Sequence, residues 1–204
     1  MNKKLVNKLK KNIRVIPDFP KKGILFQDIT SITDNKKLFT EVVNEISKYA
    51  RKKKFTKIAG VEARGFIFGA AVAFKLGLPF VPIRKKGKLP GKVLKQKYSL
   101  EYGNDEIQIH SNAITSRDRV LIIDDLIATG GTAVASAKLI SKCKVKNIEF
   151  YFILFMVCSI FNTKLFFPNF TEKELLEILL KISQDKGYLI PDDSKVLLKN
   201  QLAE

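Results

Sequence analysis

Cysteine is scarce in this chain. Only Cys143 and Cys158 occur among its 204 residues, so the sequence offers no framework of disulfide bridges. No stretch at the start combines a basic beginning, an apolar middle and a small-residue cleavage site, so we expect no secretory leader. Both features favour a reducing, cytoplasmic setting.

Long apolar runs are also missing. The longest, residues 150–161, is shorter than the roughly 20 residues that a helix needs to cross a bilayer. We therefore expect this run to be a buried strand or part of the core, and we expect no membrane partner.

Arginine is rare for so basic a protein. The net charge is +17, yet only six of the 37 basic residues are arginine, and the lysines are scattered along the chain. Such a charge attracts polyanions, but no aromatic platform or reader motif accompanies it, so we expect no specific nucleic-acid partner. The alternative is a basic nucleic-acid or scaffold protein, which would bind polyanions in a salt-dependent way without turning over a ligand.

What the chain does contain is an alternation of helical patterns and short apolar runs. Its 204 residues, 46% of them hydrophobic, suffice for one α/β domain with an appendage. Apolar spacing predicts helices at residues 1–16, 38–49, 65–76 and 132–142. Strands are predicted at residues 24–26, 57–61, 80–83 and 120–123. This order favours βαβ units and a parallel sheet.

Two of these segments have further features. The first helix would present apolar residues at helical spacing, namely Leu5, Leu9, Ile13 and Ile16. The polar residues 85–97 include two glycines and a proline, which predicts a long mobile loop.

A phosphate-binding pattern follows the strand at residues 120–123. Asp124 and Asp125 stand at the strand's end, where ligands bind in doubly wound sheets. Small and hydroxyl residues come next, and their backbone N–H groups, with the next helix's positive end, can close around an anion. These residues are Ala128, Thr129, Gly130, Gly131 and Thr132. The alternative is an ordinary strand-to-helix connection capped by threonine; neither a nucleotide-triphosphate loop nor G-x-G-x-x-G is present.

This segment resembles the 5-phosphoribosyl-1-pyrophosphate (PRPP) signature of the type I phosphoribosyltransferases. The resemblance implies that Asp124 and Asp125 contact the ribose hydroxyls. It also implies that residues 128–132 hold the 5′-phosphate.

A second segment, residues 17–30, is similar to the hood of the adenine phosphoribosyltransferases. The resemblance implies that Leu25, Phe26 and Gln27 form the adenine-binding part of the hood, with main-chain groups reading the base edge. Many family members have arginine in place of Gln27, a change that leaves the backbone groups intact. From the residues alone, this stretch is a turn bounded by prolines and a short strand.

Residues 60–69 resemble the family's pyrophosphate loop. Arg64 suits that role, because a guanidinium at a strand-to-helix turn can bind two phosphate oxygens at once. The alternative is a surface arginine paired with Glu62.

Residues 82–91 and 98–103 resemble the family's flexible catalytic loop. The resemblance implies that Lys85 and Lys88 neutralise the leaving pyrophosphate together with Arg64, that Tyr102 lies with them, and that Glu101 is the acid/base partner of the purine. The other lysines of this region are interpreted as a solvated face, and His110 as structural.

Together these matches, over about residues 5–149, imply an α/β protein with the type I phosphoribosyltransferase fold. A mainly parallel central sheet would be flanked by helices, with a small N-terminal hood and a divergent C-terminal tail. The expected division is residues 1–35 for the first helix and hood, 36–155 for the core, and 156–204 for the tail.

The activity implied is that of a pentosyltransferase of purine salvage, which converts adenine and PRPP to AMP and pyrophosphate. The resemblance also implies a homodimer and Mg²⁺, held mainly by substrate and water with no dedicated protein site. The alternatives are a phosphoribosyltransferase for another purine, a decayed or non-catalytic member, and a regulator built on the same fold.

The tail departs from the family pattern. Residues 171–174 read as a capping box before an apolar helical stripe, and a second short helix is predicted after Pro191. These helices could pack on the core, pair with another subunit, or belong to a C-terminus changed by a shifted reading frame.

Overall fold

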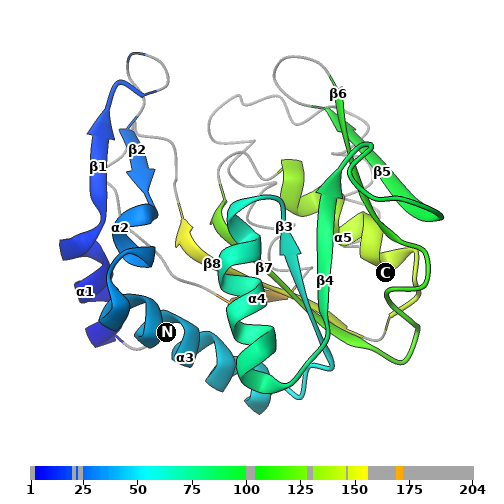
Figure 1. The fold of residues 1–204 in the computed structure, drawn as a ribbon, viewed down its shortest axis with the longest axis horizontal. Coiled ribbons are helices and arrows are strands. Elements are labelled where there is room, and N and C mark those ends of the chain that lie inside the picture. Colours follow the sequence, from blue (N-terminus) through cyan, green and yellow to red (C-terminus); the bar gives the residue numbers. More distant parts are fainter. Residues whose placement is uncertain are drawn as a thin grey trace.

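The computed structural model describes residues 3–19, 22, 25–99, 104–127, 131–145, 147–155 and 169–171. Its N-terminal part combines helices with a two-stranded antiparallel sheet. The helices are α1 (Lys3–Asn12), α2 (Thr30–Thr33) and α3 (Lys36–Lys52), and the strands are β1 (Arg14–Pro17) and β2 (Leu25–Asp28). Figure 1 shows these elements at one side of the molecule.

The first helix is shorter than its apolar spacing predicts. Leu5 and Leu9 are buried as expected, but the helix ends at Asn12 and Ile16 lies on β1. Strand β1 pairs with β2 along its whole length, from Arg14 opposite Asp28 to Pro17 opposite Leu25. Pairing between segments distant in sequence therefore overrides the local helical period.

The central sheet confirms the predicted α/β architecture. Its strands, with the helices that connect them, are β3 (Lys57–Val61), α4 (Arg64–Leu76), β4 (Phe80–Lys85), β5 (Val93–Ser99), β6 (Asn104–His110), β7 (Arg119–Ile127), α5 (Gly131–Ser141), β8 (Asn147–Phe155) and β9 (Asn169–Thr171). Within the described ranges the strand order is β5-β6-β4-β3-β7-β8-β9. The four strands β4, β3, β7 and β8 run parallel, and the pairs nearer the edges are antiparallel.

Residues 85–97 are only partly a loop, so that expectation is corrected. Strand β5 begins at Val93 and pairs with β6 through seven residues, from Val93 opposite His110 to Ser99 opposite Asn104. Its lysines lie on an edge strand, where charged side chains are common. The polar composition that favours a loop is therefore also that of an edge strand exposed to water.

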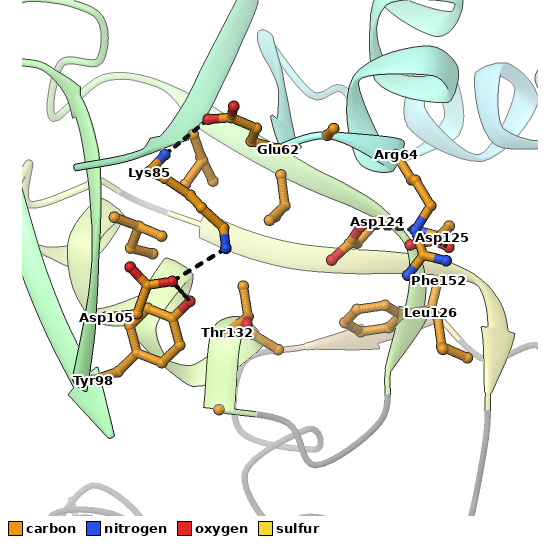
Figure 2. A pocket seen from close by; sticks show the side chains of 16 residues that line it. Glu62, Arg64, Lys85, Tyr98, Asp105, Asp124, Asp125, Leu126, Thr132 and Phe152 are labelled. Carbon is orange, nitrogen blue, oxygen red and sulfur yellow. Dashed lines mark hydrogen bonds and ion pairs between the residues drawn. The ribbon is translucent and has the colours of Figure 1, made fainter. Parts of the chain in front are cut away.

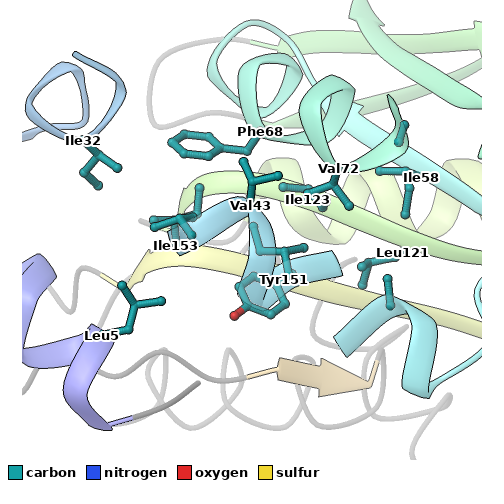
Figure 3. Packing of buried hydrophobic residues seen from close by; sticks show 14 of the residues in the cluster. Leu5, Ile32, Val43, Ile58, Phe68, Val72, Leu121, Ile123, Tyr151 and Ile153 are labelled. Atoms are coloured by element: carbon teal, nitrogen blue, oxygen red, sulfur yellow. The ribbon is translucent and has the colours of Figure 1, made fainter. Parts of the chain in front are cut away.

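Two hydrophobic cores cover the two faces of the sheet. One lies beneath α5 and includes Leu139, Ile122 and Phe150. The other lies beneath α1, α3 and α4, and Figure 3 shows Leu5, Phe68 and other members of it meeting the inner strands. Residues 120–123 are fully buried and alternate between the two cores, as expected for a parallel strand covered on both faces.

The division into residues 1–35, 36–155 and 156–204 stays a prediction. Leu5 and Leu9 belong to the same core as α3 and α4, so the first helix is packed onto the central part of the chain. Of the tail, only residues 169–171 are described, and both predicted tail helices lie outside the described residues. In the part of the chain that the structure describes, no helix is long and apolar enough to cross a membrane.

The packing of α3 generates a stability prediction. Ile46 is fully buried, so Ile46→Ala should lower the free energy of unfolding by about 2–5 kcal/mol through lost burial and a new cavity. Lys48→Ala changes an exposed residue of the same helix and should alter it by less than about 0.5 kcal/mol. Urea denaturation of both variants measures the difference, and equal losses would contradict this account of the core.

Candidate active site

A pocket of about 310 Å³ opens at the carboxyl ends of the parallel strands. Its walls come from the turn between β3 and α4, the end of β7, the start of α5 and the β4-β6-β5 side of the sheet. Figure 2 shows Arg64 and Asp125 on one side of this pocket and Lys85 on the other. This is the place where open α/β sheets bind ligands.

Asp124 and Asp125 lie together at the end of β7. Asp125 is almost completely buried, and its backbone N–H donates to Asp124 Oδ1 at 2.9 Å. Burial, together with the neighbouring Asp125 charge, raises the pKa of Asp124 well above its ordinary value. Burial also raises the pKa of Asp125, although the Arg64 charge opposes that shift.

Arg64 sits on the first turn of α4, beside these carboxylates. Its Nε lies 3.0 Å from Asp125 Oδ2, and its guanidinium carbon lies 5.9 Å from the ring centroid of Phe26. Oδ2 nevertheless has no hydrogen bond from the described residues, so the contact is an ion pair without hydrogen-bond geometry. The guanidinium therefore joins the hood to the acidic pair, and the Arg64 side chain is 42% exposed.

Arg64 is not paired with Glu62, so that alternative is wrong. Glu62 accepts from Arg84 Nη2 at 3.3 Å and from the backbone N–H of Lys85 at 2.9 Å. The hydrogen bond from Arg84 lowers the pKa of Glu62. Glu62 thus binds the end of β4, and Arg64 remains available in the pocket.

The start of α5 supplies the described part of the expected phosphate loop. Gly131 and Thr132 line the pocket, and α5 begins at Gly131, so the positive end of this helix adjoins the pocket. Ala128, Thr129 and Gly130 lie outside the described residues.

The far wall carries Lys85 together with two residues to which the sequence assigned no role. Lys85 Nζ lies 3.4 Å from Asp105 Oδ2, and the Tyr98 hydroxyl donates to the same oxygen at 3.2 Å. Polar and apolar residues alternate from Glu106 to His110, and extending that period back by one residue would have placed Asp105 on the same face as the buried Ile107. No comparable pattern marks Tyr98, because the lysines before it give this strand the composition of a loop.

Of the remaining expected site residues, the structure describes Lys88 but not Glu101 or Tyr102. Lys88 is exposed, and its carbonyl accepts from Arg84 Nη1 at 3.2 Å. Glu101 and Tyr102 lie outside the described residues. His110 is half-buried at the end of β6, opposite Val93.

In the hood, the expected adenine-binding residues form β2. Phe26 packs edge-on against Phe19, with ring centroids 5.0 Å apart. Gln27 is buried, and no described residue donates a hydrogen bond to its Oε1. Leu25, Phe26 and Gln27 are not among the described residues that line the pocket, so Arg64 is the link between the hood and the pocket.

The carboxylate oxygens in the pocket suit a hard cation that takes most of its other ligands from substrate and water. No cluster of three or more His, Cys, Asp or Glu side chains that could hold a metal occurs in the described ranges. Asp125 Oδ2 still has hydrogen-bonding capacity, and Asp124 lies beside it. Mg²⁺ binds in this way, through one or two carboxylates together with substrate phosphates and water.

Comparisons with known proteins decide the family. Residues 28–166 match the phosphoribosyl transferase domain. The chain is 48% identical over 154 residues to the adenine phosphoribosyltransferase of Aeromonas salmonicida, covering 76% of this chain and 85% of that protein. With the enzyme of Actinobacillus succinogenes the identity is 54% over 142 residues, covering 70% and 78%. This chain belongs to the adenine phosphoribosyltransferase family.

Solved structures of adenine phosphoribosyltransferases agree. The Saccharomyces cerevisiae enzyme, in complex with an imino-altritol bisphosphate and adenine, has a TM-score of 0.73 and 38% identity, covering 76% of this chain and 90% of that one. The Thermoanaerobacter pseudethanolicus enzyme has a TM-score of 0.66 and 49% identity, covering 71% and 86%. The type I fold is thereby confirmed, and the family match continues past Glu149 to residue 166.

The acidic pair at the end of β7 generates a prediction about stability and pH. A raised pKa in the folded state means that ionised Asp124 costs stability, and the cost appears as pH rises above the unfolded pKa of about 3.9. Asp124→Asn should therefore raise the free energy of unfolding of the ligand-free protein near neutral pH. The gain should shrink as pH falls towards about 3, below the unfolded pKa, where the carboxyl is protonated in both states.

Urea denaturation across this pH range measures the effect. Asp34→Asn, which removes an exposed carboxylate at the end of α2, is the matched control for the loss of one negative charge. A stabilisation by Asp124→Asn that did not change with pH would contradict the assigned direction of the pKa.

Proposed function

We propose that this pocket joins adenine to the anomeric carbon of PRPP and releases pyrophosphate, which makes the chain a pentosyltransferase of purine salvage that forms AMP. One observation carries the assignment of the pocket: an acidic pair lies between two cations, Arg64 and Lys85, beside the positive end of α5. Relatives named as adenine phosphoribosyltransferases favour adenine over another purine.

In this proposal the two ends of the substrate meet opposite charges. The ribose hydroxyls donate to Asp124 and Asp125, which supplies the hydrogen bonds that the buried Oδ2 of Asp125 lacks. Donors to a carboxylate favour its charged form, so substrate binding would lower the pKa of the pair. The 5′-phosphate binds at residues 128–132, where Gly131 and Thr132 open α5.

Catalysis would be mainly electrostatic. As the bond to pyrophosphate lengthens, positive charge grows on the ribose and negative charge grows on the leaving group. Asp124 and Asp125 stabilise the ribose side, while Arg64, Lys85 and Lys88 stabilise the pyrophosphate. Mg²⁺, bound to the substrate phosphates and water with the acidic pair at hand, would supply further neutralisation of charge.

The hood would complete the site on the side of the base. Main-chain groups of Leu25 and Gln27 read the adenine edge, and the Phe26 ring lies between Phe19 and Arg64. We assign the acid/base role at the purine to Glu101, and a place beside the pyrophosphate to Tyr102.

Two further proposals concern the setting of the protein. A homodimer is supported by apolar side chains that α4 exposes, with Ile67 at 43% and Phe74 at 91% exposure, because such residues favour a covered surface. A cytoplasmic location is supported by the free thiol of Cys143.

Removing Arg64 tests its assignment to the pyrophosphate. Arg64→Ala should lower kcat/KM for PRPP by about 100-fold or more, because a cation directed at the leaving group is lost. Arg117→Ala removes an exposed arginine and is the matched control. A coupled assay of AMP formation measures both variants, and activity of Arg64→Ala equal to that of the control would overturn the role.

Base preference tests the assignment to adenine. Adenine should be turned over with a kcat/KM at least about 100-fold above that of hypoxanthine or guanine, because a site built for the amino-purine edge leaves polar groups unpaired against a 6-oxopurine. Chromatography of the nucleotide products with each base supplies the measurement. Preference for a 6-oxopurine would move the chain to another branch of the fold.

A further inference from the structure

One carboxylate in the pocket lies where its charge has the wrong sign for the proposed ligand. Asp105 lines the same pocket as Lys85, on the wall opposite Arg64. Pyrophosphate is a polyanion, so an unpaired carboxylate here would repel it. The contacts of Asp105 show how that charge is used.

Asp105 is held by two hydrogen bonds. Its Oδ1 accepts the backbone N–H of Glu106 at 2.7 Å, and its Oδ2 accepts the Tyr98 hydroxyl at 3.2 Å. Tyr98 stands directly opposite Asp105 in the β5-β6 pairing, and its hydroxyl also interacts with the Thr132 side chain at the start of α5. Backbone and tyrosine thus fix the carboxylate, and the tyrosine ties it to the phosphate-binding end of the pocket.

Lys85 is the cation that this fixed carboxylate faces. Its Nζ lies 3.4 Å from Asp105 Oδ2, while its backbone N–H is bound by Glu62. The side chain is 59% exposed, and a lysine left free in water samples many rotamers. An ammonium group has three donors, so one can face Asp105 while the others remain available to a phosphate oxygen.

We propose that Asp105 is a positioning residue, which holds the Lys85 ammonium over the pocket so that it meets the pyrophosphate without first losing side-chain freedom. The inference rests on the proposed role of Lys85 at the pyrophosphate. Asp105 acts through Lys85 and does not itself touch the substrate. The ion pair with Asp105 already restricts the Lys85 side chain in the ligand-free protein. Binding of the ligand therefore loses less side-chain entropy.

A double-mutant cycle separates positioning from simple charge. Asp105→Asn keeps the shape and an acceptor for the Glu106 N–H but loses the charge that holds Lys85. We expect it to weaken the binding of magnesium pyrophosphate by about tenfold, and Lys85→Met to weaken it at least as much. The Asp105→Asn/Lys85→Met protein should bind within about twofold of Lys85→Met alone, because Asp105 has nothing left to position. Isothermal titration calorimetry measures the four affinities.

Glu106→Gln is the matched control, because it removes the same charge from the next residue of β6, which points to the other face of the sheet. It should leave pyrophosphate affinity unchanged. Tighter pyrophosphate binding by Asp105→Asn would show that the carboxylate only repels the ligand. If Asp105→Asn lowered pyrophosphate affinity equally in the wild-type and the Lys85→Met proteins, the effect would be structural. Either result overturns the inference.

The readout also distinguishes this inference from the proposed function. Pyrophosphate affinity does not require turnover, so the cycle is decided even if the wild-type chain forms no AMP. Coupling between Asp105 and Lys85 without AMP formation would support the positioning role and contradict the proposed reaction. If Lys85→Met bound pyrophosphate as well as wild type, both the role of Lys85 and the inference would fail.

Discussion

The close approach of the β3-α4 turn to the end of β7 is the constraint on which the site depends. A Cβ atom at Gly65 would lie 2.6 Å from the carbonyl oxygen of Ile123 and 3.1 Å from Asp124 Oδ1, so only glycine allows this packing. The contact sets Arg64 beside Asp125 and brings the positive start of α4 to the acidic pair. Without it, Arg64 would not lie beside the acidic pair.

The same packing explains why the site lowers the stability of the ligand-free protein. Two adjacent carboxylates lie at one strand end, Asp125 buried and Asp124 half-buried, and the loss of contact with water raises the pKa of both. Arg64 offsets part of that cost, but its contact lacks hydrogen-bond geometry and its side chain stays partly exposed. Polar groups held in this state are suited to a ligand that brings its own donors and cations. The cost to stability and the capacity to bind PRPP thus have one origin.

Sequence reasoning predicted the central part of the fold closely, because parallel strands such as β3 and β7 are continuous apolar runs bounded by clear helices. Four of the residues that it assigned to the site, Asp124, Asp125, Arg64 and Lys85, line one pocket, and their roles stay predictions. It failed where pairing between distant segments overrides a local pattern, as for Ile16 on β1. Tyr98 and Asp105 were missed for the same reason, since their meeting follows from the register of β5 and β6 and from no spacing within either strand.

Ligand-dependent stability tests the central claim, that the acidic pair and its cations form a PRPP site. A ligand that binds only the folded state raises the free energy of unfolding, by about 2.7 kcal/mol at 100 times its Kd. The melting temperature of the wild-type chain should rise on addition of PRPP with Mg²⁺, and that of an Asp124→Ala/Asp125→Ala variant should not. An equal rise in both proteins, or none in the wild type, would contradict the account.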